Sequence, residues 1–293
     1  MHKSGFVNII GNPNVGKSTL MNALVGEKLS IITSKAQTTR HRIMGIVSGE
    51  DFQIVYSDTP GILKPSYKLQ ESMMKFVTGA VTDADVILYV TDTVEQGDRS
   101  AEIIGRIRES GIPTVVVINK IDLSTPEALD ALVDKWRQEL PEAQIVPASA
   151  KENFNIEGVF KTILALLPEG PAFYPKETLT DKTLRFFASE IIREKILKFY
   201  DKEIPYCCEI EIDSYREEPA IDRIAATIYV ARDSQKGILI GHKGEKLKRV
   251  GQTAREDMEQ FLGKKVFLQL FVKVSDDWRN DERQLRRFGY EQE

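Results

Sequence analysis

The chain has 293 residues, which at roughly 150 residues per domain favours two domains over one. Apolar residues make up 42% and charged residues 29%, so a disordered, collagen-like or coiled-coil protein is excluded. The only two cysteines, Cys207 and Cys208, are sequence neighbours that can close no loop, which excludes a disulfide-stapled secreted protein. The N-terminus has no signal or transit pattern, and no apolar run approaches the roughly 18 residues of a membrane span. We therefore expect a cytoplasmic protein.

The first part of the chain alternates short β-branched runs with helical patterns. Such alternation predicts an α/β domain with a mostly parallel sheet covered by helices on both faces. Four Pro and Gly residues within eight then break the pattern at 168–175. We place this domain at residues 1–170 and a linker at 171–180. Strands are predicted at 6–10, 43–47, 52–57, 86–91, 114–118 and 144–146, and helices at 17–24, 66–81, 100–109, 126–139 and 156–167.

The second part of the chain has a different order of elements. We expect a smaller α+β domain over residues 181–276, with the order α-β-β-α-α-β, and a charged tail at 277–293 with no assigned structure. The two cysteines would open the first strand, with one thiol buried and the other facing outward. The predicted elements are a helix at 182–200, strands at 207–213 and 223–231, a short apolar stretch at 237–240, a helix at 245–261 and a strand at 266–274.

A phosphate-binding loop is predicted where the sequence matches G-x-x-x-x-G-K-[ST] between a strand and a helix. Its backbone N–H groups and the start of the following helix would hold a polyphosphate. Lys17 would bring positive charge to the β- and γ-phosphates, and the Ser18 hydroxyl would be a ligand of Mg²⁺. An ordinary glycine-rich turn is the alternative. The candidate residues are Gly11, Asn12, Pro13, Asn14, Val15, Gly16, Lys17, Ser18 and Thr19.

A second motif, Asn119-Lys120-Ile121-Asp122, follows the strand at 114–118 and indicates that the base is guanine. A partly buried Asp122 carboxylate can accept hydrogen bonds from guanine N1–H and the 2-amino group, which adenine cannot match. Asn119 can tie the base to neighbouring loops, and the Lys120 stem can cover one face of it. Further along the chain, the segment Ser149-Ala150-Lys151 can supply a backbone N–H, in our interpretation that of Ala150, to guanine O6.

Two further segments are expected to sense the γ-phosphate. In Asp58-Thr59-Pro60-Gly61, the aspartate would hold Mg²⁺ and the Gly61 N–H would reach the γ-phosphate. In the polar segment 37–40 we favour Thr39 over Thr38 as the Mg²⁺ ligand that is ordered only with the γ-phosphate. The predicted metal ligands are thus Ser18, Thr39 and Asp58. The predicted catalytic residues are Lys17, Asn14, Thr39 and Gly61.

These elements, in this order, resemble the translation-factor-like GTPases and, more narrowly, the Era family. The resemblance extends over both domains and implies GTP or GDP with Mg²⁺ as ligands and slow GTP hydrolysis. It also implies a K⁺ ion against the phosphates at Asn14, because Ile62 occupies the place where many GTPases carry a glutamine. The implied partner is the single-stranded 3′ end of small-subunit rRNA, and the implied role is biogenesis of the small ribosomal subunit. We expect a monomer. Peripheral association with the inner membrane stays open.

The segment around Gly241 and Gly244 resembles the Gly-x-x-Gly loop of a type II KH domain, except that His242 stands where basic residues are usual. Five basic residues face only Glu245 between positions 236 and 249, which predicts contacts with RNA phosphates. The apolar residues at 238–240, Leu239 among them, would form a floor for unstacked bases. The predicted RNA-binding residues are Lys236, Ile238, Ile240, Gly241, His242, Lys243, Gly244, Lys246, Lys248 and Arg249.

Two alternatives remain open. The protein could bind RNA with a structural nucleotide that is not turned over, or it could be a related GTPase that serves RNA modification or membrane traffic. Multiple-turnover phosphate release that depends on Lys17 would separate the first alternative from a GTPase switch. The Gly-x-x-Gly segment argues against the second.

Overall fold

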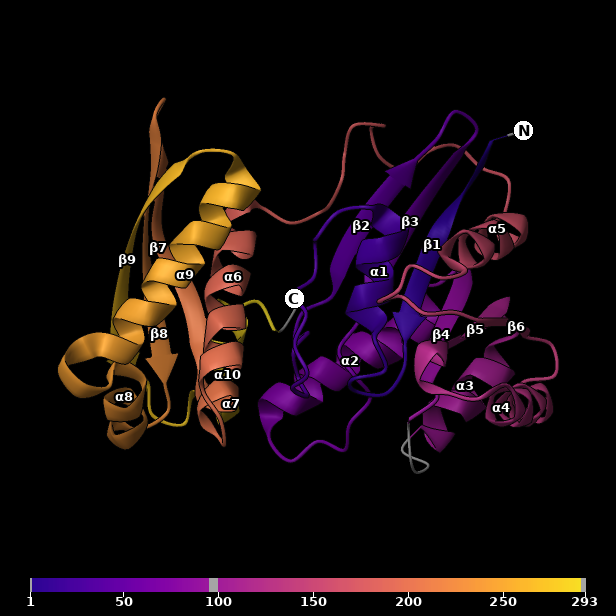
Figure 1. Cartoon of the computed structure of the whole chain (residues 1–293), viewed down its shortest axis with the longest axis horizontal. Helices are drawn as coiled ribbons and strands as arrows, with labels where there is room; N and C mark the ends of the chain where they lie inside the picture. Colours follow the sequence, from indigo (N-terminus) through magenta and orange to yellow (C-terminus); the bar gives the residue numbers. More distant parts are fainter. Residues whose placement is uncertain (1, 95–99, 291–293) are drawn as a thin grey trace. The chain divides into compact units, whose positions relative to one another are not determined.

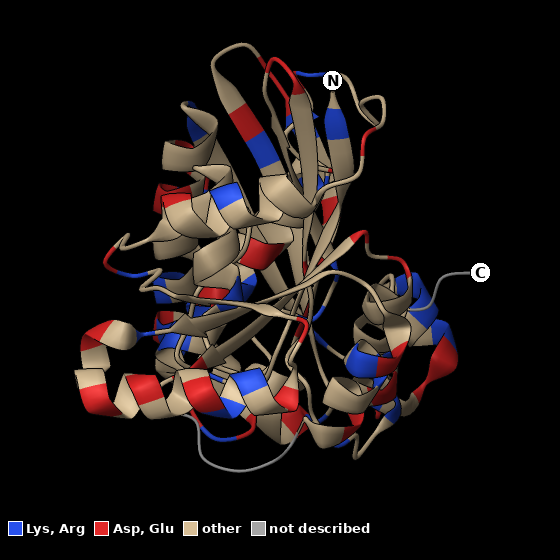
Figure 2. Ribbon diagram, turned by 90° about the vertical axis from the view of Figure 1, so that its right-hand side faces the viewer, with Lys and Arg blue, Asp and Glu red and all other residues tan. Residues whose placement is uncertain are grey.

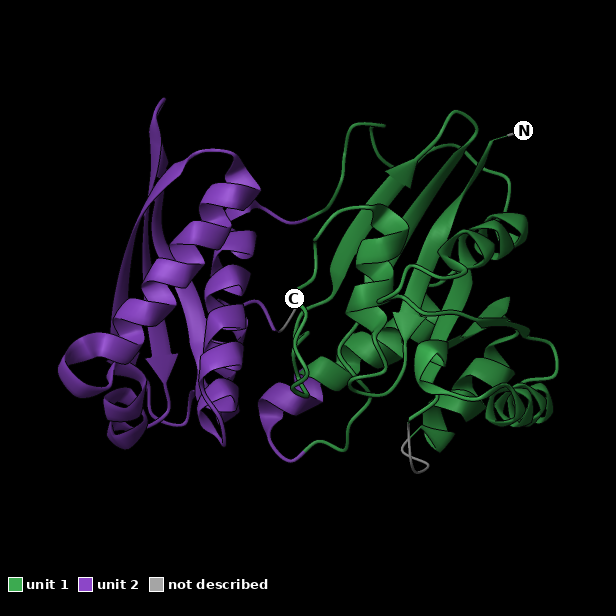
Figure 3. Cartoon of the chain, viewed as in Figure 1, with its two compact units in different colours: residues 1–65, 73–181 green, residues 66–72, 182–293 purple. Residues whose placement is uncertain are grey.

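A computed structural model describes residues 2–94 and 100–290 of the chain. By its internal contacts the chain divides into two compact units (Figure 3). Unit 1 comprises residues 1–65 and 73–181, and unit 2 comprises residues 66–72 and 182–293. The expected segment 171–180 therefore belongs to unit 1.

Unit 1 is built on a six-stranded sheet with the strand order β2-β3-β1-β4-β5-β6 (Figure 1). β2 is antiparallel to β3, and all other neighbouring strands are parallel. β4 and β5 are buried along their whole length, as a parallel sheet covered on both faces requires. The strands are β1 (Lys3–Ile10), β2 (Ile43–Ser48), β3 (Phe52–Asp58), β4 (Val86–Asp92), β5 (Thr114–Asn119) and β6 (Gln144–Pro147).

The helices of unit 1 lie on both faces of this sheet. One apolar core joins α2, α3 and α4 to β1, β4 and β5, and Figure 1 shows α1 and α5 on the opposite face. The predicted α/β architecture is confirmed, and every strand and helix predicted for this part is present within three residues of its expected ends. The helices are α1 (Lys17–Val25), α2 (Lys68–Thr82), α3 (Ala101–Ser110), α4 (Pro126–Glu139) and α5 (Ile156–Leu166), with a 3₁₀ turn η1 (Ile121–Leu123).

The segment expected as a linker is hydrogen-bonded to unit 1. The Ile46 N–H of edge strand β2 donates to the Leu179 carbonyl (2.8 Å), and Thr180 Oγ1 donates to the Met44 carbonyl (2.6 Å). The Gln53 side chain accepts hydrogen bonds from the backbone N–H groups of residues 173 and 174. A composition rich in Pro and Gly thus marks a segment without helix or strand, yet its position along the edge of the sheet is well defined.

Unit 2 has a three-stranded sheet in the order β7-β8-β9, with β7 antiparallel and β9 parallel to β8. Helices α6 and α9 contribute buried apolar residues to one core with all three strands. The predicted order α-β-β-α-α-β is present, with one additional short helix, α7. The elements are α6 (Leu184–Phe199), α7 (Ile204–Cys207), β7 (Glu209–Glu217), β8 (Ile221–Val230), α8 (Asp233–Ile240), η2 (His242–Gly244), α9 (Glu245–Leu262) and β9 (Lys265–Val274).

Two expectations for unit 2 were wrong in detail. Cys207 ends helix α7 instead of opening a strand, and both Cys207 and Cys208 are fully buried, whereas one was expected to face outward. Both thiols donate to the Ile204 carbonyl, at 3.3 and 3.1 Å, which a helical turn after Pro205 makes possible. The apolar stretch at 237–240 is the second half of α8.

The charged tail is described up to residue 290 and packs on unit 2. Trp278 is fully buried, and its indole N–H donates to the Cys207 carbonyl (2.8 Å). The Tyr290 hydroxyl donates to Glu209 on β7 (2.6 Å). The tail contains η3 (Trp278–Asn280) and α10 (Glu282–Arg287), while its last three residues lie outside the described part.

The distribution of charged and apolar residues is consistent with the architecture of the two units. Acidic and basic residues are interspersed along the ribbon of Figure 2. Within residues 2–94 and 100–290, no helix combines the length and the apolar character that crossing a membrane requires.

Candidate functional site

A cavity of about 850 Å³ opens in unit 1 where the parallel strands end. It joins the predicted phosphate loop, the 31–39 segment, Gly61 and the loops that follow β5 and β6, which is where ligands bind in open α/β sheets. The predicted site residues that line it are Pro13, Asn14, Gly16, Lys17, Ser18, Thr19, Thr39, Gly61, Asn119, Lys120, Asp122, Ala150 and Lys151.

The loop between β1 and α1 has the geometry of a phosphate cradle. Gly16 precedes α1 with φ 94°, and a Cβ at this position would lie 2.2 Å from the Asn119 side-chain amide, so only glycine fits. The buried Lys17 ammonium donates to the carbonyls of Gly11 (3.0 Å) and Asn12 (2.8 Å), which holds it over the loop. The start of α1 adds free N–H groups and the positive end of its dipole.

Three hard oxygen donors meet beside this loop. Ser18 Oγ donates to Asp58 Oδ2 (2.7 Å) and lies 2.9 Å from Thr39 Oγ1, which itself donates to Asp58 Oδ2 (3.2 Å). The structure thus brings together the three predicted metal ligands from α1, the 31–39 segment and β3. Thr38 instead bonds to Thr33 and to the Lys35 carbonyl.

The environment of Asp58 fits a bound cation. Asp58 is fully buried, and its Oδ1 accepts no hydrogen bond from the described part of the chain. Burial raises the pKa of the Asp58 carboxyl, while the Ser18 hydrogen bond and the Lys17 charge act in the opposite direction. A divalent cation at this position would compensate the buried negative charge and use the remaining oxygen lone pairs. The residues present therefore fit Mg²⁺.

Asn119 connects the phosphate loop to the loop that follows β6. Its side-chain amide donates to the Val15 carbonyl (2.8 Å), and its Oδ1 accepts from the Ala150 N–H (2.9 Å). Asn119 therefore joins the two loops, whereas its contact with the base stays a prediction. The Ala150 N–H donates to this bridge, and its donation to guanine O6 likewise stays a prediction.

The other two residues of this motif are held in place by different partners. The Lys120 ammonium donates to the Asn14 carbonyl (2.6 Å) and to Asp92 (2.5 Å), which stretches its stem across the cavity. Asp122 accepts a hydrogen bond from the buried Ser149 hydroxyl (2.5 Å). Asp122 is exposed at the mouth of the cavity, whereas it was expected to be partly buried.

Some predicted site residues are buried or contact other protein groups and do not line the cavity with a free polar group, or lie exposed at its edge. The Thr59 hydroxyl donates to the Ile9 carbonyl (2.7 Å) inside the protein, and Pro60 is buried. Lys151 is exposed and pairs with Glu152. Ile62 is buried in the apolar core beneath the site, so it offers no side chain to an attacking water.

Sequence reasoning missed several residues of this site. Asp92 holds Lys120, and the apolar Leu123 lines the cavity although 65% of its surface is exposed. Ile31 and Ile32 also line this cavity. An aspartate that ends a buried strand, and an exposed leucine directly after Asp122, were the signals that could have indicated them.

In unit 2 the glycine loop between α8 and α9 has the predicted sharp turn. Gly241 and Gly244 have φ values of 75° and 80°, and Lys243 between them has φ 48°. Gly244 caps the start of α9, so the free N–H groups of that helix follow the loop. The loop therefore presents backbone donors without Cβ atoms that would hinder a nucleic-acid backbone.

A basic surface surrounds this loop. Lys243, Lys246, Lys248 and Arg249 are exposed, and none of them forms an ion pair within residues 2–94 and 100–290. The Arg249 guanidinium lies over the Phe199 ring, with 4.3 Å between its central carbon and the ring centroid. These charges are thus available to phosphates.

The predicted apolar floor is smaller than expected. Ile238 is 45% exposed and Ile240 is half-buried beside the loop, but Leu239 is fully buried in the core. Because α8 is helical, these three neighbours point in different directions. Lys236 is half-buried on α8, and His242 is exposed.

The phosphate cradle, the three converging oxygen donors and the α-β-β-α-α-β unit define a P-loop GTPase joined to a KH domain. Two family models match accordingly: "50S ribosome-binding GTPase" over residues 6–120 and "KH domain" over residues 203–279. The chain is 45% identical over 99% of both chains to GTPase Era of Alkaliphilus metalliredigens, and 46% identical to GTPase Era of Syntrophus aciditrophicus over 99% of this chain and 96% of that one. It belongs to the Era family of GTPases.

Solved structures agree with this assignment. A crystal structure of Era in complex with MgGDPNP and nucleotides 1506–1542 of 16S ribosomal RNA matches with a TM-score of 0.95 and 40% identity over 100% of both chains. A variant of Aquifex aeolicus Era bound to GDP·AlF₄⁻ also matches with a TM-score of 0.95, at 41% identity over 99% of this chain and 100% of that one.

Proposed function

We propose that this GTPase is a nucleotide-controlled RNA-binding switch that engages the single-stranded 3′ end of small-subunit rRNA and assists small-subunit biogenesis. The observation that carries the proposal is the presence, in one chain, of the Ser18–Thr39–Asp58 cluster and the exposed basic loop at 241–244. The full-length similarity to Era solved with MgGDPNP and 16S rRNA nucleotides supports the choice of both ligands.

In this proposal Ser18, Thr39 and Asp58 hold Mg²⁺, which neutralises charge on the phosphates when it is bound. Lys17 and the loop N–H groups bind the β- and γ-phosphates, and Asp122 selects guanine. Thr39 is the residue that senses the γ-phosphate, since it reaches the cluster from a separate segment. The residue after Gly61 is Ile62, whose side chain cannot orient a water molecule, so hydrolysis depends on positioning and charge.

On the RNA side, the loop N–H groups and four exposed basic side chains would bind phosphates, while Ile238 and Ile240 would contact unstacked bases. The cationic residues are Lys243, Lys246, Lys248 and Arg249, with Lys236 and His242 at the margin.

The test uses a labelled single-stranded RNA with the sequence of the small-subunit rRNA 3′ end. We expect its affinity, measured by fluorescence anisotropy, to differ between the GDPNP-bound and GDP-bound protein. We also expect multiple-turnover phosphate release that Lys17→Ala abolishes. Tight RNA binding that is identical in both nucleotide states, with no turnover, would favour the second candidate function, an RNA-binding protein with a structural nucleotide.

Several finer points belong to the same proposal. The protein would act in the cytoplasm as a monomer, with K⁺ as an additional cation at Asn14. Peripheral association with the inner membrane would rest on surface contacts, and flotation with liposomes of inner-membrane lipids would detect it.

A further inference from the structure

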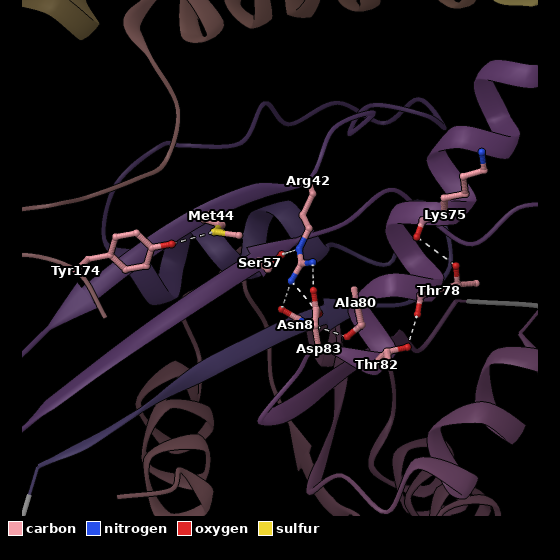
Figure 4. A network of polar contacts seen from close by, with 10 residues as sticks. All are labelled: Asn8, Arg42, Met44, Ser57, Lys75, Thr78, Ala80, Thr82, Asp83 and Tyr174. Atoms are coloured by element: carbon pink, nitrogen blue, oxygen red, sulfur yellow. Dashed lines mark hydrogen bonds and ion pairs between the residues drawn. The ribbon is translucent and has the colours of Figure 1, made fainter. Parts of the chain in front are cut away.

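The Arg42 side chain points toward Asn8, Ser57 and Asp83, and Asp83 directly follows helix α2 (Figure 4). Its Nε donates to Ser57 Oγ (2.5 Å), and its Nη2 donates to Asn8 Oδ1 (2.9 Å). Its two terminal nitrogens donate to the two oxygens of Asp83, at 2.5 and 3.1 Å. One guanidinium therefore joins three separate parts of unit 1.

Asp83 and Asn8 close the C-terminal end of α2. The Asp83 N–H donates to the Gly79 carbonyl (3.1 Å), and Asn8 Nδ2 donates to the Ala80 carbonyl (2.8 Å) and to Asp83 Oδ1 (2.6 Å). A carboxylate at the negative end of a helix dipole is unfavourable unless a cation faces it. The Arg42 guanidinium is that cation, so the end of α2 depends on a residue outside the helix.

Position and burial separate this contact from an ordinary surface ion pair. The Asp83 side chain is 52% exposed, but the Arg42 side chain is only 17% exposed, and Asn8 is fully buried with its amide nitrogen and oxygen both hydrogen-bonded. A planar two-pronged contact with a carboxylate is more rigid than a single exposed pair. Exposed pairs such as Arg137–Asp134, with side chains 69% and 68% exposed, lack these features.

Arg42 is also close to the Ser18–Thr39–Asp58 cluster, both in sequence and in the sheet. It follows Thr39 by three residues and immediately precedes β2, where Ile43 pairs with Asp58 and Met44 pairs with Ser57. Its partner Ser57 directly precedes Asp58. The same side chain thus holds the root of the Thr39 segment and the strand that carries Asp58 against the end of α2.

Resting on the proposed function, in which Thr39 senses the γ-phosphate, we propose that Arg42 is a positioning residue that couples the placement of Thr39 at the Mg²⁺–γ-phosphate site to helix α2. When Thr39 joins Ser18 and Asp58, the residues that follow it up to Arg42 are held in position. The two-pronged contact between Arg42 and Asp83 (the Arg42 fork) then transmits this position to the last turn of α2. Without the fork, Thr39 order and α2 position become independent. Arg42 contacts neither phosphate nor metal in this role.

The test compares affinities for GDPNP and GDP at saturating Mg²⁺ by calorimetry. Arg42→Ala should reduce the preference for GDPNP over GDP by about fivefold or more, while GDP affinity stays within about twofold. Arg42→Lys keeps the charge but loses the fork, and it should shift the preference in the same direction. Asp83→Asn should have a similar effect, and combining it with Arg42→Ala should add little.

Hydrogen exchange supplies a readout that a purely structural role would not change. In the unmodified protein the backbone amides of residues 79–82 should exchange at different rates with GDPNP and GDP, and in Arg42→Ala this difference should disappear. Arg137→Ala, which breaks the exposed pair on α4, is the matched control and should leave both readouts unchanged.

Two results would overturn the proposal. One is an equal loss of affinity for both nucleotides, or a lower melting temperature with an unchanged preference, since either describes a residue that only stabilises the fold. The other is exchange at 79–82 that is insensitive to nucleotide in the unmodified protein. If Arg42→Ala does not fold, Asp83→Asn, which keeps the side-chain shape, decides by the same criteria.

Discussion

Asp122 stands at the mouth of the nucleotide cavity with one carboxylate oxygen held by the Ser149 hydroxyl. Its other oxygen accepts no hydrogen bond from the described residues, so the carboxylate can bind a base that carries two adjacent donors. We predict that Asp122→Asn weakens GTP binding and strengthens binding of xanthosine triphosphate, whose C2 oxygen accepts a hydrogen bond where guanine donates. Competition titration with a fluorescent nucleotide measures both affinities.

Asp134→Asn on the exposed face of α4 is the control for this substitution, and it should leave both affinities unchanged. If Asp122→Asn still prefers GTP over the xanthine nucleotide by more than about tenfold, equivalent to 1.4 kcal/mol, the carboxylate does not read the base.

Asn14 is the residue to which we assign K⁺-dependent catalysis. Its φ of 66° is a backbone conformation that asparagine tolerates better than most residues, so turn geometry alone could explain its presence. We predict faster basal phosphate release in K⁺ than in Na⁺ at equal ionic strength, and loss of this difference in Asn14→Ala while GTP still binds.

Asn14→Gly separates the two roles, because glycine keeps the turn but removes the amide oxygen. It should also lose the K⁺ effect. Equal phosphate-release rates in the two salts for the unmodified protein would leave Asn14 with a turn role only. Ile62→Ala is a separate check, and it should change the rate only modestly because no polar contact is lost.

The motif residues could be predicted because their spacing places backbone and side-chain donors at one strand end. Asp92, which holds Lys120, could not be predicted, because the sheet brings it in from a distant strand and no local sequence pattern indicates it. The partner of the Ala150 N–H was also not predictable from the local sequence. Its N–H looked free in sequence, but Asn119 from another strand engages it.

At the level of elements, the loop between α8 and α9 carries the RNA prediction. Gly241→Asp with Gly244→Asp adds side-chain bulk and two negative charges where phosphates approach, so RNA affinity should fall well over about tenfold at constant salt. GTP hydrolysis without RNA should be nearly unchanged. Anisotropy with labelled RNA and a phosphate-release assay measure the two effects.

Gly263→Asp provides a matched control. Gly263 follows α9 with φ 63° and open space where a Cβ would lie, so aspartate there introduces similar backbone strain and one negative charge, half that of the double variant, away from the loop. RNA binding by a folded double variant that equals the control would remove the loop from the RNA site.

The elements with clear periodicity were predictable, whereas the short helices α7 and α10 were not. Helix α7 has four residues and depends on Pro205 at its start and on buried contacts. Helix α10 is capped by the Asp281 carboxylate, which accepts from two backbone N–H groups, but its six residues carry too little periodicity to be detected in a charged tail. Trp278, which no sequence pattern singled out, anchors that tail through its buried indole ring.

Considering the whole chain, the break of pattern at 168–175 led us to expect two domains, and the internal contacts divide the chain into two units, with residues 66–72 grouped with the second. The chemistry of each unit lies in loops at the ends of its regular elements. Composition could not show that residues 173–181 lie along the first unit. Propensity describes the preference of a backbone segment, whereas docking depends on a sheet edge that is distant in sequence.

This docking has a consequence for dissecting the protein. β2 is an edge strand, and the 173–181 segment covers part of its hydrogen-bonding edge, which otherwise could pair with another chain. A nucleotide-binding fragment ending at Gly170 should therefore self-associate, while one ending at Asp181 should remain monomeric at the same concentration. Light scattering distinguishes them, and equal monodispersity would show that the edge needs no cover. We therefore expect the stretch that joins the two units to protect the first unit against self-association.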